Sequence, residues 1–437
     1  MWWRNEAPPV RWVAAAIYLL VTLALLVSAP NERLGTHTPF NHFALLAEAW
    51  LDGQLHLARG VPEYTGHNDF AVFDGEVHVS FPPFPAVLLL PVVALAGSAE
   101  ATRDGLVFVL LAGLGPALLY VALARLSELG RSQRSFVENA GLALASAFGT
   151  VFWFTAVQGT VWFAAHVTGF ALAAAFIATS LDARSPLWAG VALGLACATR
   201  TPLLFLAPLF FVELYARTRR ELDAAPCDGA AWRRAARDLA RFALPVLVVG
   251  ALLAWHNHAR FGDAFEFGHR HLAIAWRPRI ERWGLFSLHY LGRNLGVMLA
   301  STPFLGAKGA PLQISGHGLA LWITSPFLLW ALWPRRLWGA RRASYVGVAC
   351  AAFAVALPAL LYQNTGWLQF GYRFSNDFCP LLVVMIALGR RRLGAPFWGL
   401  VLLSVLVNGF GALSFQRPGW EAYYAIEPTQ RVIFEPD

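Results

Sequence analysis

A short polar segment between two apolar runs, residues 366–382, carries the side chains best suited to bind an anion. It reads GWLQFGYRFSNDFCPLL and contains Tyr372, Arg373 and Asp377. An arginine guanidinium is planar and can donate two parallel hydrogen bonds to a phosphate, so Arg373 is a candidate contact for an anionic headgroup. Arg373 and Asp377 are four residues apart, which also allows an ion pair on one helical face. The spacing leaves open both a phosphate contact and a salt bridge that anchors a helix end.

Residues 29–83 carry the carboxylates that are candidates for acid–base chemistry. The segment has seven acids against two arginines, and five of the twelve histidines of the chain. Residues 257–318 are basic by comparison, and five more histidines fall between 256 and 289. If both segments lie on one side of a membrane, they can hold a proton acceptor and an anion together. Charges that collect wherever loops meet water would give the same composition, so both interpretations stay open. The acids are Glu32, Glu48, Asp52, Glu63, Asp69, Asp74 and Glu76.

Two other polar residues, His166 and Arg200, lie within or at the ends of apolar runs. Such positions are costly unless the side chain faces the protein interior. The stretch 37–78 is rich in His, Asp and Glu and has ligand types that suit a divalent metal ion, although the spacing is not diagnostic. The four cysteines are scattered without CxxC spacing, so neither a disulfide framework nor a zinc site is indicated.

The composition places these residues in a membrane protein. Hydrophobic residues make up 57% of the 437 residues and charged residues only 14%, whereas a soluble surface needs roughly a quarter charged residues. A soluble enzyme and a disordered scaffold are therefore excluded. The net charge of +8 comes from short arginine clusters between apolar runs. Such clusters indicate membrane orientation and not nucleic-acid binding.

The apolar runs predict an all-α polytopic membrane protein. A membrane span needs about 20 residues, and several runs are shorter, so we expect about ten to twelve transmembrane helices. The first run is interpreted as an uncleaved helix and not as a signal peptide, because further runs follow it. The runs are 12–28, 84–97, 105–124, 140–157, 161–181, 187–199, 202–215, 242–256, 319–333, 345–361, 380–389 and 397–413.

Arginine clusters set the predicted orientation, because positive residues remain in the cytoplasm. Three clusters are expected there together with the N-terminus. Residues 29–83 and 257–318 are then two long external loops of a single membrane domain, 1–437. Arginines at 125–134 also favour the cytoplasm, which requires that one of the short runs before them does not cross. The three clusters are 217–241, 334–342 and 390–392.

Both external loops have recognisable local patterns. Residues 40–57 place apolar side chains near helical spacing, which predicts an amphipathic helix at the membrane interface. Residues 71–79 alternate around Asp74-Gly75, a strong signal for a two-residue hairpin turn. The second loop mixes aromatic residues with the arginines Arg260, Arg270, Arg277, Arg279, Arg282 and Arg293.

This order of elements resembles the GT-C superfamily of membrane glycosyltransferases. It consists of a first helix, an external loop with an interfacial helix, a hairpin after Asn68-Asp69, and a proline-rich entry at 81–91 into the next helix. The nearest subgroup is the bacterial one related to dolichyl-phosphate-mannose protein mannosyltransferases and the lipid A aminoarabinose transferase. The likeness covers most of the chain as an architecture. Four other segments also show this likeness, namely 52–55, 197–202, 260–262 and 369–373.

The resemblance implies an inverting transfer of a hexosyl or pentosyl group from a polyprenyl-phosphate donor. The reaction would take place on the external face of the bacterial cytoplasmic membrane, and the acceptor would be a glycan, a lipid or a protein. A carboxylate in the first external loop would be the general base, and arginines or a metal would hold the growing charge on the lipid phosphate. Many family members carry this acid at the start of the interfacial helix, where this chain has Asn41 and His42. We therefore predict that Asp69, which precedes the hairpin and should lie near the membrane surface, is the base, with Glu48 and Glu63 as alternatives.

The resemblance also suggests which residues contact the substrate. We expect these contacts on both external loops and at the ends of the neighbouring helices. The alternative is a lipid-linked sugar flippase or exporter without catalytic activity, but such transporters usually contain internal repeats, and the sequence shows none. Nucleic acid is not an expected partner. The predicted contacts are Arg373, Tyr372, Arg200, His166, Arg260, Asn41 and His42.

Overall fold

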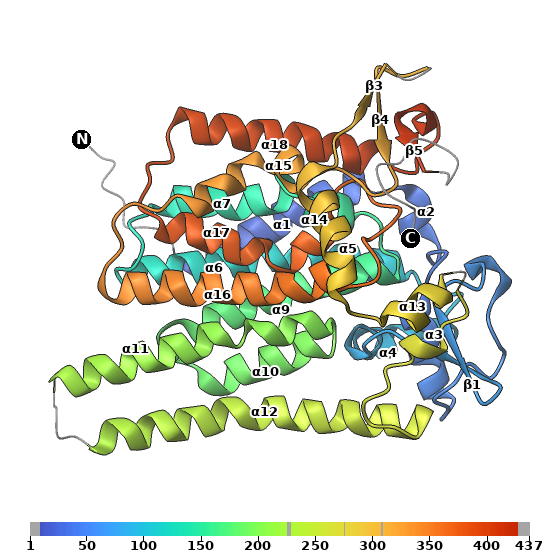
Figure 1. Ribbon diagram of the computed structural model, residues 1–437, viewed down its shortest axis with the longest axis horizontal. Coiled ribbons are helices and arrows are strands. Elements are labelled where there is room, and N and C mark those ends of the chain that lie inside the picture. Colours follow the sequence, from blue (N-terminus) through green and yellow to red (C-terminus); the bar gives the residue numbers. More distant parts are fainter. Residues whose placement is uncertain (1–8, 225–228, 275, 307–308, 427–437) are drawn as a thin grey trace.

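The computed structural model describes residues 9–224, 229–274, 276–306 and 309–426. Within these residues, six helical stretches are long and apolar enough to cross a membrane, and shorter apolar helices accompany them. The long helices run side by side in one bundle (Figure 1). The predicted all-α polytopic class is therefore confirmed, while the number of crossings stays a prediction. The six stretches are α1 (Val10–Ser28), α5 with α6 (Asp104–Ala112 and Leu114–Glu128), α9 (Val161–Ser180), α12 (Gly229–Phe261), α16 (Gly339–Leu361) and α18 (Ala395–Ser414).

The shorter elements begin where the local sequence favours a helix start. Ser135 and Glu138 form a reciprocal capping box before α7, and Pro186 occupies the first turn of α10, where its missing N–H is not needed. The shorter apolar helices are α3 (His42–Leu51), α4 (Phe84–Ala96), α7 (Phe136–Phe148), α10 (Pro186–Cys197) and α17 (Cys379–Leu388). The other α-helices are α2 (Asn31–Gly35), α8 (Phe152–Ala156), α11 (Pro208–Ala224), α13 (Arg277–Trp283), α14 (Leu291–Ala300) and α15 (Leu321–Thr324). Short 3-10 helices cover Glu63–Thr65, Leu181–Ala183, Thr201–Leu206, His269–His271, Leu288–Tyr290, Pro326–Leu332, Arg373–Asp377 and Glu421–Tyr423.

Small residues let the helices of the bundle approach closely. A Cβ atom added to Gly190 of α10 would lie 2.1 Å from the carbonyl oxygen of Phe242 in α12. Only glycine fits at that distance. Close contact through small residues is the usual way in which membrane helices pack, because lipid provides no hydrophobic drive for their association.

The arginine clusters gather at one end of the bundle, which we call the arginine-rich end. Arg131 forms ion pairs with Glu213 and with Asp182, the latter at 2.7 Å. Arg341 donates to the carbonyl oxygen of Gly130 at 3.3 Å. Further contacts join Arg220 to Asp182 and Arg134 to the carbonyl oxygen of Arg391. The arginines of the clusters at 125–134, 217–241, 334–342 and 390–392 thus lie at one end of the bundle, which is consistent with the predicted common side.

Helix α4 is the apolar run before residue 125 that does not pass through the bundle. At its start, the N–H of Phe84 donates to the carbonyl oxygen of Ala198. Just after its end, the carbonyl oxygen of Ala99 accepts from Asn41 at 3.3 Å. Both anchors lie at the end opposite the arginine clusters, and α4 lies beside α3 there (Figure 1). This placement resolves the conflict between the number of apolar runs and the arginines at 125–134.

The predicted helix and hairpin of the first loop are both present at this opposite end. Strands β1 (Phe70–Phe73) and β2 (Glu76–Val79) pair antiparallel, with Phe73 opposite Glu76. Asp74 and Gly75 form the turn with φ values of 49° and 80°, the left-handed conformation that such turns require. Helix α3 is shorter than the predicted 40–57, and seven of its ten residues are buried. It therefore packs as part of the protein core and presents little surface to an interface.

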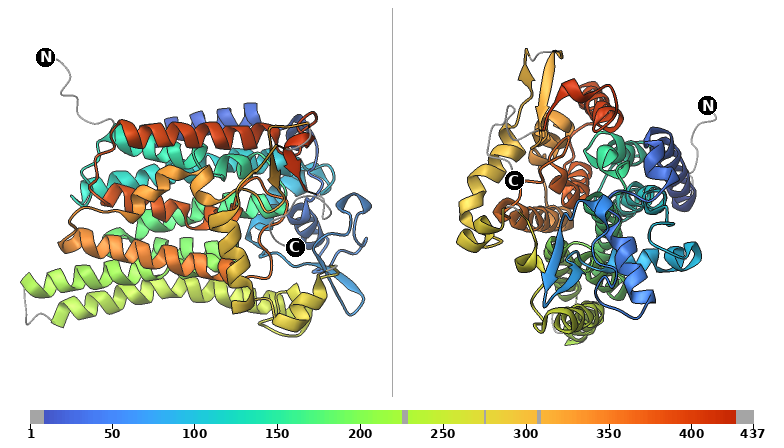
Figure 2. Two further views of the ribbon diagram at one scale, coloured as in Figure 1. Left: turned by 45° about the horizontal axis from the view of Figure 1, so that its top comes forward. Right: turned by 90° about the vertical axis from the view of Figure 1, so that its right-hand side faces the viewer.

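The second loop is also at this end (Figure 2). Helix α12 continues to Phe261, so the segment expected as the second loop, 257–318, begins with the last turn of this helix. The loop contains α13 and α14 and two strands, β3 (Phe304–Leu305) and β4 (Leu312–Ser315). Strand β4 pairs antiparallel with β3 and parallel with β5 (Tyr424–Ala425).

Candidate active site

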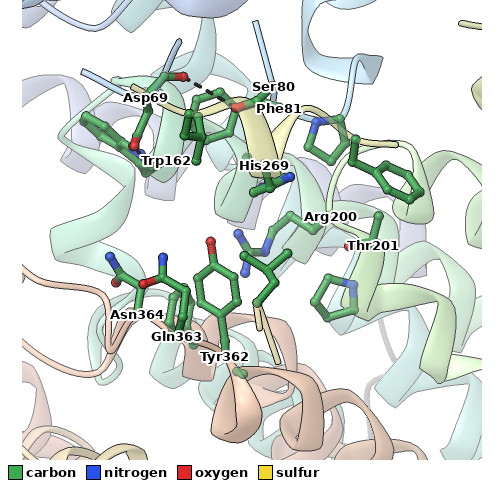
Figure 3. Close-up of a pocket in the computed structure, with 18 of the residues that line it drawn as sticks. Asp69, Ser80, Phe81, Trp162, Arg200, Thr201, His269, Tyr362, Gln363 and Asn364 are labelled. Atoms are coloured by element: carbon green, nitrogen blue, oxygen red, sulfur yellow. Dashed lines mark hydrogen bonds between the residues drawn. The ribbon is translucent and has the colours of Figure 1, made fainter. Parts of the chain in front are cut away.

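A cavity of about 1230 Å³ lies where both loops meet the bundle. We call this the pocket end of the molecule. The walls come from the segment before the hairpin, the start of α9, residues 199–202, the second loop and the segment after α16. Arg200 and Tyr362 project into the cavity, and Asp69 and Trp162 lie at one side of it (Figure 3). Four of the predicted site residues line the cavity: Asp69, His166, Arg200 and Arg373.

Asp69 is the predicted base among the three carboxylates that line this cavity, the others being Glu266 and Glu281. It has a φ of 61°, a left-handed conformation that aspartate tolerates better than most residues. Its Oδ2 accepts a hydrogen bond from the indole N–H of Trp162 at 2.8 Å. Burial raises the pKa of Asp69, and the Trp162 hydrogen bond and the positive charge of Arg373 oppose this effect. The carboxylate is therefore a stronger base than an exposed aspartate.

Asn41 and His42 do not line the cavity, and His42 supports the segment that carries Asp69. The His42 Nε2 donates to the carbonyl oxygen of Asn68 at 2.8 Å, and the imidazole stacks on Phe70 with ring centroids 4.2 Å apart. Burial lowers the pKa of His42 to about 4, so the ring is neutral at neutral pH. The Asn41 side chain bonds the Ala99 carbonyl oxygen. Of these two predicted substrate contacts, His42 therefore holds the backbone next to Asp69, and Asn41 holds the turn that follows α4.

Arg373 lies at the cavity wall between two aromatic rings. Its guanidinium carbon is 5.3 Å from the ring centroid of Phe163 and 5.6 Å from that of Phe374. Both distances are within the range of a cation–π contact. The backbone N–H of Arg373 donates to Oε1 of Gln369 at 2.9 Å. The two rings, together with the hydrogen bond that Nη1 donates to the carbonyl oxygen of Trp367 at 3.3 Å, restrict the directions that the guanidinium can take.

Arg200, Asp377 and His166 form a network at the cavity wall, in which Arg200 and His166 line the cavity and Asp377 lies behind them. Arg200 donates from Nε to Asp377 Oδ1 at 2.8 Å and from Nη2 to Oδ2 at 2.8 Å. His166 Nδ1 lies 3.1 Å from Asp377 Oδ1. Burial by itself would raise the pKa of Asp377, but the charge of Arg200 and the contact with His166 outweigh it and hold the pKa at about 2. Asp377 is therefore ionised and can only accept hydrogen bonds. Nδ1 of His166 must therefore carry the proton of the hydrogen bond between the two side chains.

The ion pair between Arg373 and Asp377 that the spacing allowed is not formed. Asp377 turns instead toward Arg200, which is 177 positions earlier in the chain. The segment Arg373–Asp377 is a 3-10 helix, and its tighter winding does not place residues four apart on one face as an α-helix does. The structure therefore separates Arg373, which faces the cavity, from Asp377, which does not line it.

Arg260 and Tyr372, also predicted as substrate contacts, lie outside the cavity lining. Arg260 is buried and donates to the carbonyl oxygen of Val79 at 2.7 Å and to Asn257 at 3.0 Å. It joins the end of α12 to the hairpin. Tyr372 is fully buried, and burial raises the pKa of its hydroxyl. Both residues occupy structural positions next to the site.

The side chains of the first loop do not gather into a metal site. Among the residues that the structure describes, no group of three His, Cys, Asp or Glu side chains is arranged to hold a metal ion. Histidines of the stretch 37–78 serve other contacts. His78 Nδ1, for example, bonds the carbonyl oxygen of Leu55 at 3.1 Å, and His56 lies 3.3 Å from Glu76. The residues present therefore do not fit a three-ligand metal centre, and no step proposed below depends on one.

Three residues on one face of α9 support the site, and the first of them, Trp162, was not predicted from the sequence. Trp162 bonds Asp69, Phe163 lies against Arg373, and His166 bonds Asp377. Residues four apart lie on the same face of an α-helix, so Trp162 and His166 are stacked one turn apart. An aromatic residue at the start of an apolar run is also typical of a membrane interface. Trp162 could therefore not be distinguished from an ordinary interfacial residue by its position in the sequence.

Comparisons with known proteins show the fold. ArnT of Cupriavidus metallidurans, solved with undecaprenyl phosphate bound, matches with a TM-score of 0.50 and 14% identity over 90% of this chain and 62% of its own length. The apo oligosaccharyltransferase of Archaeoglobus fulgidus matches with a TM-score of 0.53 and 12% identity over 100% of this chain and 62% of its own. No protein-family model matches the chain, and no curated protein matches it in sequence. The expected architecture is therefore confirmed at the level of the fold, and the chain spans 62% of the length of each of these two proteins.

Proposed function

We propose that this protein is an inverting glycosyltransferase that moves a sugar from a polyprenyl-phosphate donor to an acceptor hydroxyl. The observation that carries the proposal is that one cavity is lined by a basic carboxylate, Asp69, and by several arginines, among them Arg200 and Arg373. A proton acceptor and an anion site are the two groups that this reaction needs. The fold supports the proposal, because one protein with this fold was solved with undecaprenyl phosphate bound.

Asp69 would begin the reaction as general base. Trp162 holds Oδ2 of the carboxylate, which orients Asp69 toward an acceptor hydroxyl in the cavity. As the carboxylate takes the hydroxyl proton, the acceptor oxygen attacks the anomeric carbon on the face opposite the phosphate. A new glycosidic bond forms, the bond between the anomeric carbon and the phosphate oxygen breaks, and its electron pair leaves with the lipid phosphate. Attack from the opposite face inverts the anomeric configuration.

The arginines would stabilise the leaving lipid phosphate. Its negative charge grows as the sugar departs, and fixed donors aimed at that charge stabilise the transition state more than the ground state. Arg373 is restricted by two aromatic rings, and Arg200 by its two-pronged contact with Asp377. Because neither guanidinium must reorient during the reaction, both are suited to this role.

The orientation of the protein is part of the proposal. The arginine-rich end would lie in the cytoplasm, because positively charged segments are retained there. The pocket end would then open on the external face of the membrane. The protein would be located in the bacterial cytoplasmic membrane. The acceptor would be a glycan, lipid or protein on that face.

The proposal is tested with purified protein, a polyprenyl-phosphate donor labelled in its sugar, and an envelope lipid or glycan acceptor. We expect labelled acceptor and free polyprenyl phosphate in equal amounts, with the anomeric configuration inverted. A flippase or exporter would instead move the donor across a vesicle membrane and leave its sugar–phosphate bond intact. Transport of uncleaved donor without transfer would therefore refute the proposed reaction.

The pH dependence of transfer provides a test of the base. The ionised carboxylate is the active form, so activity is present above the pKa of Asp69 and is lost as the pH falls through it. The Trp162 hydrogen bond lowers this pKa against the effect of burial. Trp162→Phe should therefore raise the pKa and shift the acid limb of the kcat/KM profile to higher pH by about one unit. The measurement is kcat/KM for the donor from acid to neutral pH.

A matched variant separates this effect from a general loss of packing. The ring of Phe40 lies 4.7 Å from that of Trp162, so Phe40→Leu disturbs the same aromatic cluster without removing the indole N–H. We expect its acid limb to coincide with that of the native protein. An unshifted limb in Trp162→Phe would show that Asp69 is not the group that titrates.

A further inference from the structure

We propose that Asp377, supported by His166, is a positioning residue that fixes the guanidinium of Arg200 for the donor phosphate. The inference rests on the proposed function and assigns a role to residues that do not take part in the chemistry directly. Asp377 is almost fully buried and does not line the cavity, whereas Arg200 does and its side chain keeps 16% of its surface exposed. Any effect of Asp377 on a ligand must therefore pass through a neighbour.

The contact between Asp377 and Arg200 determines which edge of the guanidinium is available. Asp377 accepts from Nε and Nη2 of Arg200 in a two-pronged arrangement, which fixes the guanidinium plane as well as its distance. The ring of Phe374 lies 5.6 Å from the guanidinium carbon and restricts a second direction. With one edge held by the carboxylate, the other edge remains for an anion in the cavity.

His166 supports the carboxylate in turn. Its Nδ1 contacts Asp377 Oδ1 at 3.1 Å, and the side chain is fully buried in α9. An ionised carboxylate only accepts hydrogen bonds, so Nδ1–H is the donor. His166 therefore joins the network to the helix that also holds Asp69 and Arg373 through Trp162 and Phe163. Asp69, Arg200 and Arg373, the three groups needed for transfer, are thus all positioned by contacts with α9.

A purely structural ion pair would have the same distances, so the test measures a quantity that such a pair would not change. We compare the binding of polyprenyl phosphate with that of the uncharged polyprenol of the same chain length, each measured below the melting temperature of the variant. Asp377→Asn keeps the volume but loses the charge and the second acceptor oxygen. We expect it to weaken phosphate binding on the order of 10- to 100-fold, as misplacing a positioned group does, and to leave polyprenol binding unchanged.

Variants of His166 test its supporting role. The short amide of His166→Asn can still place an N–H near the position of Nδ1, so we expect phosphate binding close to that of the native protein. His166→Leu removes the donor and should behave as Asp377→Asn does. If both variants bind polyprenyl phosphate like the native protein, the supporting role of His166 is wrong.

A double-mutant cycle decides whether Asp377 acts through Arg200. Arg200→Met should weaken phosphate binding, and Asp377→Asn added to it should cause no further loss, because the group that it positions is gone. A further loss of similar size in the double variant would overturn the proposal, as would equal weakening of phosphate and polyprenol binding by Asp377→Asn. A native protein that binds polyprenyl phosphate no better than polyprenol would instead refute the proposed function itself.

Discussion

Replacing Asp69 with asparagine should lower the turnover of sugar transfer by about 10²- to 10⁴-fold, the usual cost of losing a general base. The amide is nearly isosteric with the carboxylate, and its oxygen can still accept the hydrogen bond that Trp162 donates to Oδ2. Only the capacity to take a proton is lost. Because asparagine also tolerates the left-handed backbone at this position, the variant should fold normally. The measurement is single-turnover transfer from a labelled polyprenyl-phosphate donor at saturating donor concentration.

The other acids of the first loop provide matched controls for this result. Asp74 is exposed in the hairpin turn, and Asp52 and Glu63 are exposed as well. None of these three, nor Glu48, lines the cavity. Asp74→Asn, Asp52→Asn, Glu63→Gln and Glu48→Gln should therefore retain most of the native turnover. Normal turnover in Asp69→Asn together with a large loss in one control would move the base to that residue. Activity in all five variants would exclude these five acids and leave Glu32 and Glu76 as the remaining carboxylates of this loop.

Replacing Arg373 with lysine should lower kcat/KM for the donor by about 10²- to 10³-fold, as the loss of a fixed donor at a developing charge does. Lysine keeps the charge but has neither the planar fork nor the flat surface that lies between Phe163 and Phe374, so it cannot present two parallel hydrogen bonds to phosphate. Arg373→Ala should lose at least as much activity. Steady-state kinetics with varied donor concentration provides the measurement.

Arg282 provides a control with a similar environment. Its guanidinium carbon lies 4.9 Å from the ring centroid of Trp283, but the residue is exposed on α13 and does not line the cavity. Arg282→Lys should therefore leave kcat/KM near the native value. If Arg373→Ala retains full activity at normal protein levels, Arg373 has only a structural role.

Features that depend on neighbouring residues were predictable from the sequence. The Asp74-Gly75 turn requires two left-handed residues in succession, and this dipeptide supplies them at little cost. The helical class follows from apolar runs that are too long and too numerous for a soluble protein. The spacing of the apolar residues predicted helix α3. It did not predict that the helix is buried, because this spacing does not show which segments cover its polar face.

Features that depend on distant segments were not predictable in this way. Asp377 has a nearby arginine at position 373, and spacing alone favours that partner, yet its partners are Arg200 and His166, 177 and 211 positions away. Trp162 was missed for the same reason, since its importance comes from a contact with Asp69. Hydropathy likewise counts α4 as an ordinary apolar run, and only its anchors to Ala198 and Asn41 show that it stays at the pocket end. The role of Asp69 as base stays a prediction.

Because three supporting side chains lie on one face of α9, the geometry of the site depends on the position of this one helix. Trp162, Phe163 and His166 occupy less than two turns, so their partners Asp69, Arg373 and Asp377 are aligned by the position of one rigid body. A rotation of α9 about its axis would withdraw the indole N–H, the aromatic ring and the imidazole together, whereas flexing of the segment that carries Asp69 would leave the contacts of Arg373 and Asp377 in place. The proton acceptor and the anion contacts therefore remain in register with each other for as long as α9 keeps its place against its neighbours.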